Sequence, residues 1–360
     1  MPLSLVTGFP GFIGRRLARK LLDADAGATI VALVEPRMLD AGTTAARAID
    51  GERIEVLCGD ITDRRLGVSD ADYERLAAEV RRVFHLAAIY DLSVPLELAQ
   101  RVNVDGTGNV LELCLAAKEL ERLAYVSTAY VAGRRTGVVY EHELVMGQQF
   151  KNHYESTKFQ AEVWVREAIG HVPTSIVRPA IVVGDSQTGE TQKFDGPYYL
   201  LRGIAEANRA RRSIPQFGRL EANFNVVPVD YVVEAIAALA ADPRAEGQTV
   251  HLVDPEPLTS REVVSMLSQR YAGREPQGRI PPNLVSASLR IGPVRERFGG
   301  TPPASIAYLT HPVRFDTRRA VDLLSAAGLA PPRFSGYVDA MVEYFKAHEH
   351  DQSLKPALAR

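Results

Sequence analysis

The stretch Leu3-Ser4-Leu5-Val6-Thr7-Gly8-Phe9-Pro10-Gly11-Phe12-Ile13-Gly14-Arg15 decides the fold of this chain. It opens on an apolar run suited to a buried strand, and apolar residues then recur at helical spacing over residues 16–22. Three glycines therefore fall at a turn between strand and helix, where they permit unusual backbone angles and close approach of an anion. We predict that a dinucleotide pyrophosphate meets the helix N-terminus here, contacted by Gly8, Phe9, Pro10, Gly11, Phe12 and Ile13.

The composition is that of an ordinary globular protein, with 46% apolar and 24% charged residues among 360. A net charge of -2 gives no electrostatic reason to expect nucleic acid or an anionic membrane. No segment approaches the roughly 18 to 20 apolar residues that span a bilayer, and we expect neither a signal peptide nor a transit peptide. Cys58 and Cys114 are expected to be buried thiols rather than disulfide or metal ligands. We therefore expect a cytoplasmic protein without a metal.

Strand and helix patterns alternate along the first half of the chain. Strands are expected over residues 29–34, 53–58, 82–87, 123–127 and 174–178, and helices over 69–80, 96–118 and 150–169. Gly106 and Gly108 lie inside the second of these helices and indicate close packing there. The alternation predicts an α/β fold, a doubly wound parallel (Rossmann) sheet covered on both faces.

Beyond Pro179 the alternation breaks up. Strands are expected over 225–227 and 249–253, and helices over 198–212, 229–241, 260–271, 283–298, 317–327 and 336–348. We predict that residues 1–185, with returns over 225–253, form the dinucleotide-binding domain. Residues 186–224 and 254–360 are expected to form a smaller, mostly helical substrate lobe. Its aromatic residues predict an apolar pocket: Phe194, Tyr198, Tyr199, Phe217 and Phe224.

Tyr154 and Lys158 are four residues apart and share one face of the expected helix over 150–169. A phenol with a pKa near ~10 is a poor base at neutral pH, whereas a nearby cation favours its phenolate. The same pair can deliver a proton to an oxyanion as it forms during hydride transfer. Thr128, at the end of the strand over 123–127, is placed to donate a hydrogen bond to that oxygen. Thr128, Tyr154 and Lys158 are therefore the predicted catalytic residues.

Over roughly residues 3–255 the chain resembles the extended branch of the short-chain dehydrogenase/reductase family. The family's landmarks occur in the same order: the glycine triplet, Asp60, Asn103, Thr128, Tyr154 and Lys158. The resemblance implies a Thr-Tyr-Lys triad whose lysine also holds the nicotinamide ribose. It further implies dinucleotide contacts from Asp60, Ile61, Ala87, Ala88, Asn103, Pro179 and Ile181.

Several stretches resemble the fatty acyl-CoA reductase and thioester reductase group within that branch. They include Gly59-Asp60-Ile61-Thr62, His85-Leu86-Ala87-Ala88, Val126-Ser127-Thr128-Ala129-Tyr130-Val131 and Val227-Pro228-Val229-Asp230-Tyr231-Val232. The resemblance implies reduction of an acyl thioester by a nicotinamide hydride, giving an aldehyde or alcohol. The expected partner is a small hydrophobic acyl or carbonyl compound.

The choice between NAD and NADP stays open at this point. Glu35 ends the second strand, where a carboxylate binds ribose hydroxyls and repels a 2′-phosphate, which favours NAD. Arg37 and Arg15 are placed to pair with that phosphate, and the resembling reductases generally use NADPH. Two other functions also stay open: a hydroxysteroid-type or sugar-nucleotide dehydrogenase or epimerase, and a dinucleotide sensor without turnover. A homodimer is left open as well.

Overall fold

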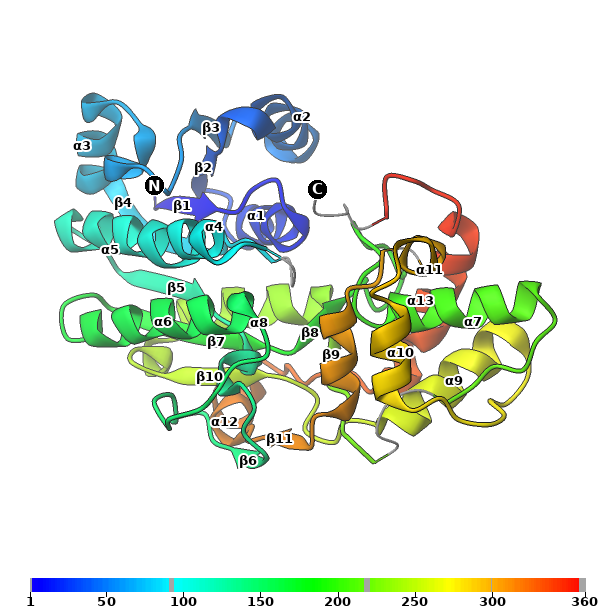
Figure 1. The fold of residues 1–360 in the computed structure, drawn as a ribbon. Helices are drawn as coiled ribbons and strands as arrows, with labels where there is room; N and C mark the ends of the chain where they lie inside the picture. The colour runs from blue at the N-terminus through cyan, green and yellow to red at the C-terminus, as the bar shows by residue number, and fades with distance from the viewer. Residues whose placement is uncertain (1, 91–93, 217–220, 299, 356–360) are drawn as a thin grey trace.

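A computed structural model describes residues 2–90, 94–216, 221–298 and 300–355. Its centre is a seven-stranded parallel sheet in the order β10-β7-β5-β4-β1-β2-β3, drawn in Figure 1. These strands are β1 (Leu3–Thr7), β2 (Thr29–Val34), β3 (Ile54–Cys58), β4 (Val80–His85), β5 (Arg122–Val126), β7 (Thr174–Pro179) and β10 (Thr249–Leu252). The strand order reverses between β1 and β4, where doubly wound sheets bind nucleotides. The predicted fold class is confirmed.

Helices cover both faces of this sheet. One face carries α1 (Phe12–Ala24), α2 (Leu39–Asp50) and α8 (Val229–Ala241), and the other carries α3 (Asp70–Glu79), α5 (Gly106–Ala116) and α6 (His153–Ala168). Successive strand residues face opposite sides. Leu5 accordingly packs into one buried apolar cluster and Val6 into the other.

The rest of the chain adds two small parallel sheets and several helices. β8 (Ile181–Val183) pairs with β9 (Val226–Pro228), and β11 (Val313–Phe315) pairs with β6 (Gly137–Val139). The remaining α-helices are α4 (Leu96–Gln100), α7 (Tyr198–Arg209), α9 (Ser260–Ala272), α10 (Pro282–Ser288), α11 (Gly292–Arg297), α12 (Arg318–Ser325) and α13 (Phe334–His348). Short 3-10 segments cover Pro36–Met38, Arg64–Gly67, Ala129–Ala132, Pro243–Ala245 and Pro303–Thr310. α7, α9 and α13 pack together, whereas α12 packs on β10 and α8.

Three helical segments differ from what the sequence predicted. The sequence analysis missed α2, because only Gly42 and Ala46 of that helix are buried and two small residues form no recognisable apolar stripe. The helix expected over 96–118 is divided by a wider π-helical turn at Arg101–Asp105. The helix expected over 283–298 is two helices, because Pro293 lacks the N–H that a continuous helix needs and instead lies in the first turn of α11.

The close packing expected at the two helical glycines is confirmed. A Cβ on Gly106 would lie 2.8 Å from the Ile61 side chain, and one on Gly108 would lie 3.1 Å from Trp164.

The two cysteines have different environments. Cys114 is buried, and burial raises its pKa to about 12. Cys58 was expected to be buried but is exposed, because β3 is the edge strand of the sheet. Within the described ranges, no three His, Cys, Asp or Glu side chains are grouped to hold a metal ion. None of the helices described is long and apolar enough to cross a membrane.

Candidate active site

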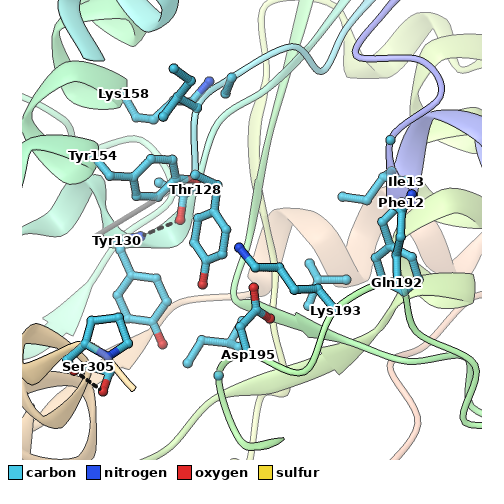
Figure 2. A pocket seen from close by; sticks show the side chains of 18 of the residues that line it. Phe12, Ile13, Thr128, Tyr130, Tyr154, Lys158, Gln192, Lys193, Asp195 and Ser305 are labelled. Atoms are coloured by element: carbon cyan, nitrogen blue, oxygen red, sulfur yellow. Dashed lines mark hydrogen bonds between the residues drawn. The ribbon is translucent and has the colours of Figure 1, made fainter. Parts of the chain in front are cut away.

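A cavity of about 1180 Å³ lies at the carboxyl ends of the central strands, with residues of the C-terminal half forming its opposite wall. Seventeen predicted site residues line it: Gly8, Phe9, Pro10, Gly11, Phe12, Ile13, Glu35, Arg37, Asp60, Ile61, Ala87, Ala88, Thr128, Tyr154, Lys158, Pro179 and Ile181. Asn103 does not. Figure 2 shows Thr128, Tyr154 and Lys158 at one side of the cavity, and Phe12 and Ile13 at the other.

The glycine loop has the geometry of an anion cradle. Gly8 adopts a φ of +83°, and its carbonyl oxygen accepts a 2.9 Å hydrogen bond from Gly11 N–H. A Cβ on Gly14 would lie 2.5 Å from that oxygen, so only glycine lets α1 start this close to β1. The N-cap of α1 is Gly11, which has no side chain to cap the first turn, so backbone N–H groups there can meet an anion. These residues fit the pyrophosphate of a dinucleotide.

The ends of β2 and β3 form the far end of the cavity. Glu35 forms an ion pair with Arg37. Asp60 accepts a 2.8 Å hydrogen bond from Thr62 N–H. Arg15 was expected near a 2′-phosphate but does not line the cavity, because its guanidinium is paired with Glu190 at 2.7 Å.

Thr128 and Tyr154 meet on one side of the cavity. The Thr128 side chain is hydrogen-bonded to Tyr154, and the ring of Tyr90 packs edge-on against Tyr154 with centroids 5.2 Å apart. The sequence predicted a lowered phenol pKa, but burial raises the pKa of Tyr154, and the bond to Thr128 opposes this only in part. The phenol is therefore protonated at neutral pH.

Lys158 is 2% exposed and contacts β5. Its Nζ donates 2.9 Å hydrogen bonds to the Tyr125 hydroxyl and the Val126 carbonyl. Burial lowers the pKa of Lys158 to about 7, and the negative charge of Glu162 partly opposes this. At neutral pH, Lys158 is therefore divided between its charged and uncharged forms.

Buried polar contacts fix the backbone around Thr128, Tyr154 and Lys158. Ser127 donates a 2.6 Å hydrogen bond to Glu162, whose carboxylate also binds Arg178 at 2.6 Å. Asn103 is 1% exposed and accepts a 2.8 Å hydrogen bond from Ile89 N–H. Asn103 thus holds the segment after β4 from behind the cavity wall.

The sequence analysis missed three polar residues that the loop between β8 and α7 contributes to the cavity: Gln192, Lys193 and Asp195. Burial raises the pKa of Asp195 to about 6, and Lys193 partly opposes this. The loop follows β8, a strand that the sequence did not indicate. The only available signal was the mixture of charged and aromatic residues over 193–199.

The aromatic residues expected in the substrate pocket divide into three groups. Tyr199 and Phe224 line the cavity. Phe194 and Tyr198 are instead buried in the apolar core, because they pack against each other and Phe345. Phe217 lies outside the described residues.

Fold and site together define an NAD(P)-dependent oxidoreductase of the extended short-chain dehydrogenase/reductase type. The chain belongs to the NAD-binding family described as male sterility protein, whose model matches residues 6–236. The carboxylic acid reductase of Segniliparus rugosus is 28% identical over 65% of this chain and 22% of its own length. The aldehyde reductase lnaA of Aspergillus flavus is 30% identical over 69% of this chain and 25% of its own length. The chain thus spans about a quarter or less of these relatives.

Solved structures share the fold. The terminal R domain from the myxalamid PKS-NRPS biosynthetic pathway superposes with a TM-score of 0.80 at 23% identity, covering 99% of this chain and 93% of that one. UDP-glucuronic acid 4-epimerase from Bacillus cereus, in complex with NAD, gives 0.67 at 20% identity, covering 98% and 100%.

Proposed function

We propose that this chain reduces a hydrophobic acyl thioester or carbonyl compound with NAD(P)H, using Thr128, Tyr154 and Lys158. The observation that carries the proposal is the convergence of these three side chains on one wall of the cavity that also contains the glycine cradle. A protein that only senses a dinucleotide has no need for such a constellation. The relatives named above as reductases support the same direction of reaction.

The raised pKa of Tyr154 suits an acid in the reductive direction. When bound, the reduced nicotinamide supplies the hydride. The Thr128 and Tyr154 hydroxyls then donate hydrogen bonds to the oxygen that becomes negative. With an aldehyde or ketone, Tyr154 gives its proton to that oxygen.

A thioester needs no nucleophile from the protein. After hydride attack the tetrahedral oxyanion, held by Thr128 and Tyr154, collapses with loss of a thiolate. Neither Cys58 nor Cys114 lines the cavity, and this route requires neither. The product is an aldehyde, which can be released or reduced once more.

The wall opposite the sheet supports an apolar substrate. Side chains from α10, α11 and the 3-10 segment Pro303–Thr310 line it, among them Val285, Leu289, Phe298, Ile306 and Leu309. Burying an acyl chain against such side chains is favourable by about 0.8 kcal/mol per CH₂. A nucleotide sugar would place hydroxyl groups against the same surface at a cost.

The substrate class can be measured at 340 nm, where reduced nicotinamide absorbs. We expect the purified protein to oxidise NAD(P)H with medium-chain or long-chain acyl-CoAs and with the corresponding aldehydes, but not with nucleotide sugars. Tyr154→Phe protein serves as the blank for uncoupled oxidation. Activity with ketones or aldehydes alone would remove the thioester assignment. Activity confined to nucleotide sugars would contradict the apolar pocket and favour the epimerase or sugar-nucleotide dehydrogenase class.

Cofactor preference is expected to depend on the ion pair at the end of β2. Because Glu35 repels a 2′-phosphate, Glu35→Gln should lower KM for NADPH relative to NADH. Because Arg37 can pair with that phosphate, Arg37→Ala should shift the ratio in the opposite direction. Titrating both cofactors against each variant measures the ratio. Identical ratios in wild type and both variants would show that neither side chain touches the adenosine ribose.

A further inference from the structure

Behind Lys158 lies a buried chain of hydrogen bonds that the proposed reaction does not use. Lys158 Nζ donates to the Tyr125 hydroxyl at 2.9 Å, and that hydroxyl is hydrogen-bonded to Thr107. Thr107 Oγ1 lies 3.0 Å from Nε2 of His85, and Nδ1 of His85 lies 2.7 Å from Thr7 Oγ1. All four supporting side chains are at most 1% exposed. The chain therefore connects the ammonium to the end of β1, beside the glycine loop.

The numbers of protons and lone pairs fix the direction of the bonds to Lys158 and to His85. A hydroxyl has one proton and two lone pairs. The Thr107 proton goes to the Asn103 carbonyl at 2.7 Å, so Thr107 accepts from His85. The Tyr125 hydroxyl accepts from Lys158 Nζ, because an ammonium has donors only.

The numbers of protons and lone pairs also assign the tautomer of His85. Its Nε2 carries the proton, because Thr107 is an acceptor there. Its Nδ1 accepts the Thr7 proton, which leaves Thr7 Oγ1 to accept Ala87 N–H at 3.2 Å. Burial lowers the pKa of His85 to about 3, with a contribution from Lys158, so the ring is neutral throughout the ordinary pH range.

We propose that Tyr125, held by Thr107 and neutral His85, is a positioning residue that orients the Lys158 ammonium. An ammonium has three N–H donors. Tyr125 and Val126 take two of them, which aims the third into the cavity that Lys158 lines. The proposal rests on the proposed function for the catalytic role of Lys158, whereas the contacts themselves belong to the ligand-free protein.

Besides Tyr125, the ionisable side chains of Glu162 and His85 bear on the charge of Lys158. Glu162 lies one turn further along α6 and favours the ammonium, and His85 at the end of β4 is neutral. The Tyr125 ring also faces the ammonium, with Nζ 4.4 Å from its centroid. Tyr125→Phe keeps that ring and removes only the hydroxyl, so it isolates the hydrogen bond.

The titration of Lys158 can be followed directly by NMR, because a chain with seven lysines gives few lysine signals. With lysine labelled by ¹³C at Cε, Lys158→Arg identifies the signal in the ligand-free protein. In Tyr125→Phe we expect its midpoint to fall by about one to two pH units, since a hydrogen bond to the charged form is lost. The alkaline limb of turnover should move to lower pH by the same amount, because the ammonium is the active form. Tyr73→Phe, in a buried tyrosine of α3 that does not line the cavity, should move neither.

An unchanged Lys158 midpoint in folded Tyr125→Phe protein would overturn the proposal. If that variant does not fold, the wild-type His85 ring decides the question, with His85→Gln identifying its ¹⁵N signals among eight histidines. The expected result is a protonated Nε2 and an unprotonated Nδ1 from pH 5 to 9, and the other tautomer would contradict the relay. Both measurements need no substrate. A wild type that reduces nothing would therefore contradict the proposed function alone.

Discussion

Replacing Tyr154 by phenylalanine is expected to lower turnover by at least ~10²-fold, the usual loss when an acid catalyst is removed. The phenol is the group hydrogen-bonded to Thr128, and its raised pKa keeps its proton available at neutral pH. The substitution retains the ring that packs against Tyr90. Dinucleotide affinity should therefore stay near the wild-type value, since the glycine loop is untouched.

Steady-state rates at 340 nm and a fluorescence titration of the reduced cofactor measure the two quantities separately. Tyr73→Phe is the matched control, because it removes a buried phenol outside the cavity. Undiminished turnover in Tyr154→Phe would remove the proposed mechanism. A parallel loss of cofactor affinity would instead indicate that the phenol binds the dinucleotide.

Replacing Lys158 by methionine is expected to lower turnover by at least ~10²-fold and yet to stabilise the ligand-free protein. The ammonium is buried, no carboxylate among the described residues contacts it directly, and its folded pKa of about 7 lies far below the unfolded value. Methionine fills similar volume without that charge. We expect the free energy of unfolding at pH 6 to rise by roughly 1 to 4 kcal/mol.

The pH dependence gives this prediction its sign. Between the folded pKa of Lys158, about 7, and the unfolded value near ~10.4, the unfolded chain binds more protons than the folded one. Wild-type stability therefore gains up to about 1.4 kcal/mol per pH unit from this group as pH rises, and bears the full cost of the charge below pH ~7. The gain of Lys158→Met should be largest at pH 6 and shrink towards pH 10.

Urea unfolding of both proteins across this pH range measures the difference. Lys118→Met, at an exposed position after α5, should change the free energy of unfolding little at any pH. A variant less stable than wild type at pH 6, with no pH-dependent difference, would contradict the prediction.

Local pattern was enough to predict the central sheet and most of the candidate dinucleotide site. The glycine loop and the strand ends at Glu35, Asp60 and Ala87 belong to consecutive strand–turn–helix units, and parallel strands bring their carboxyl ends to one edge of the sheet. β2 and α8 have the bounds that apolar periodicity predicted. Apolar periodicity did not predict α2, because its buried face is too small to produce a stripe of apolar residues.

The sequence by itself determined the doubly wound sheet, the cradle and the order of Thr128, Tyr154 and Lys158, because short-range patterns encode each of these. Only the tertiary structure decided the charge states and the opposite wall. The pKa of Tyr154 and that of Lys158 depend on burial, which no local pattern specifies. Asp195 and Tyr125 entered the site because distant segments pack there, and the partners of a buried polar atom are fixed only when the whole chain has folded.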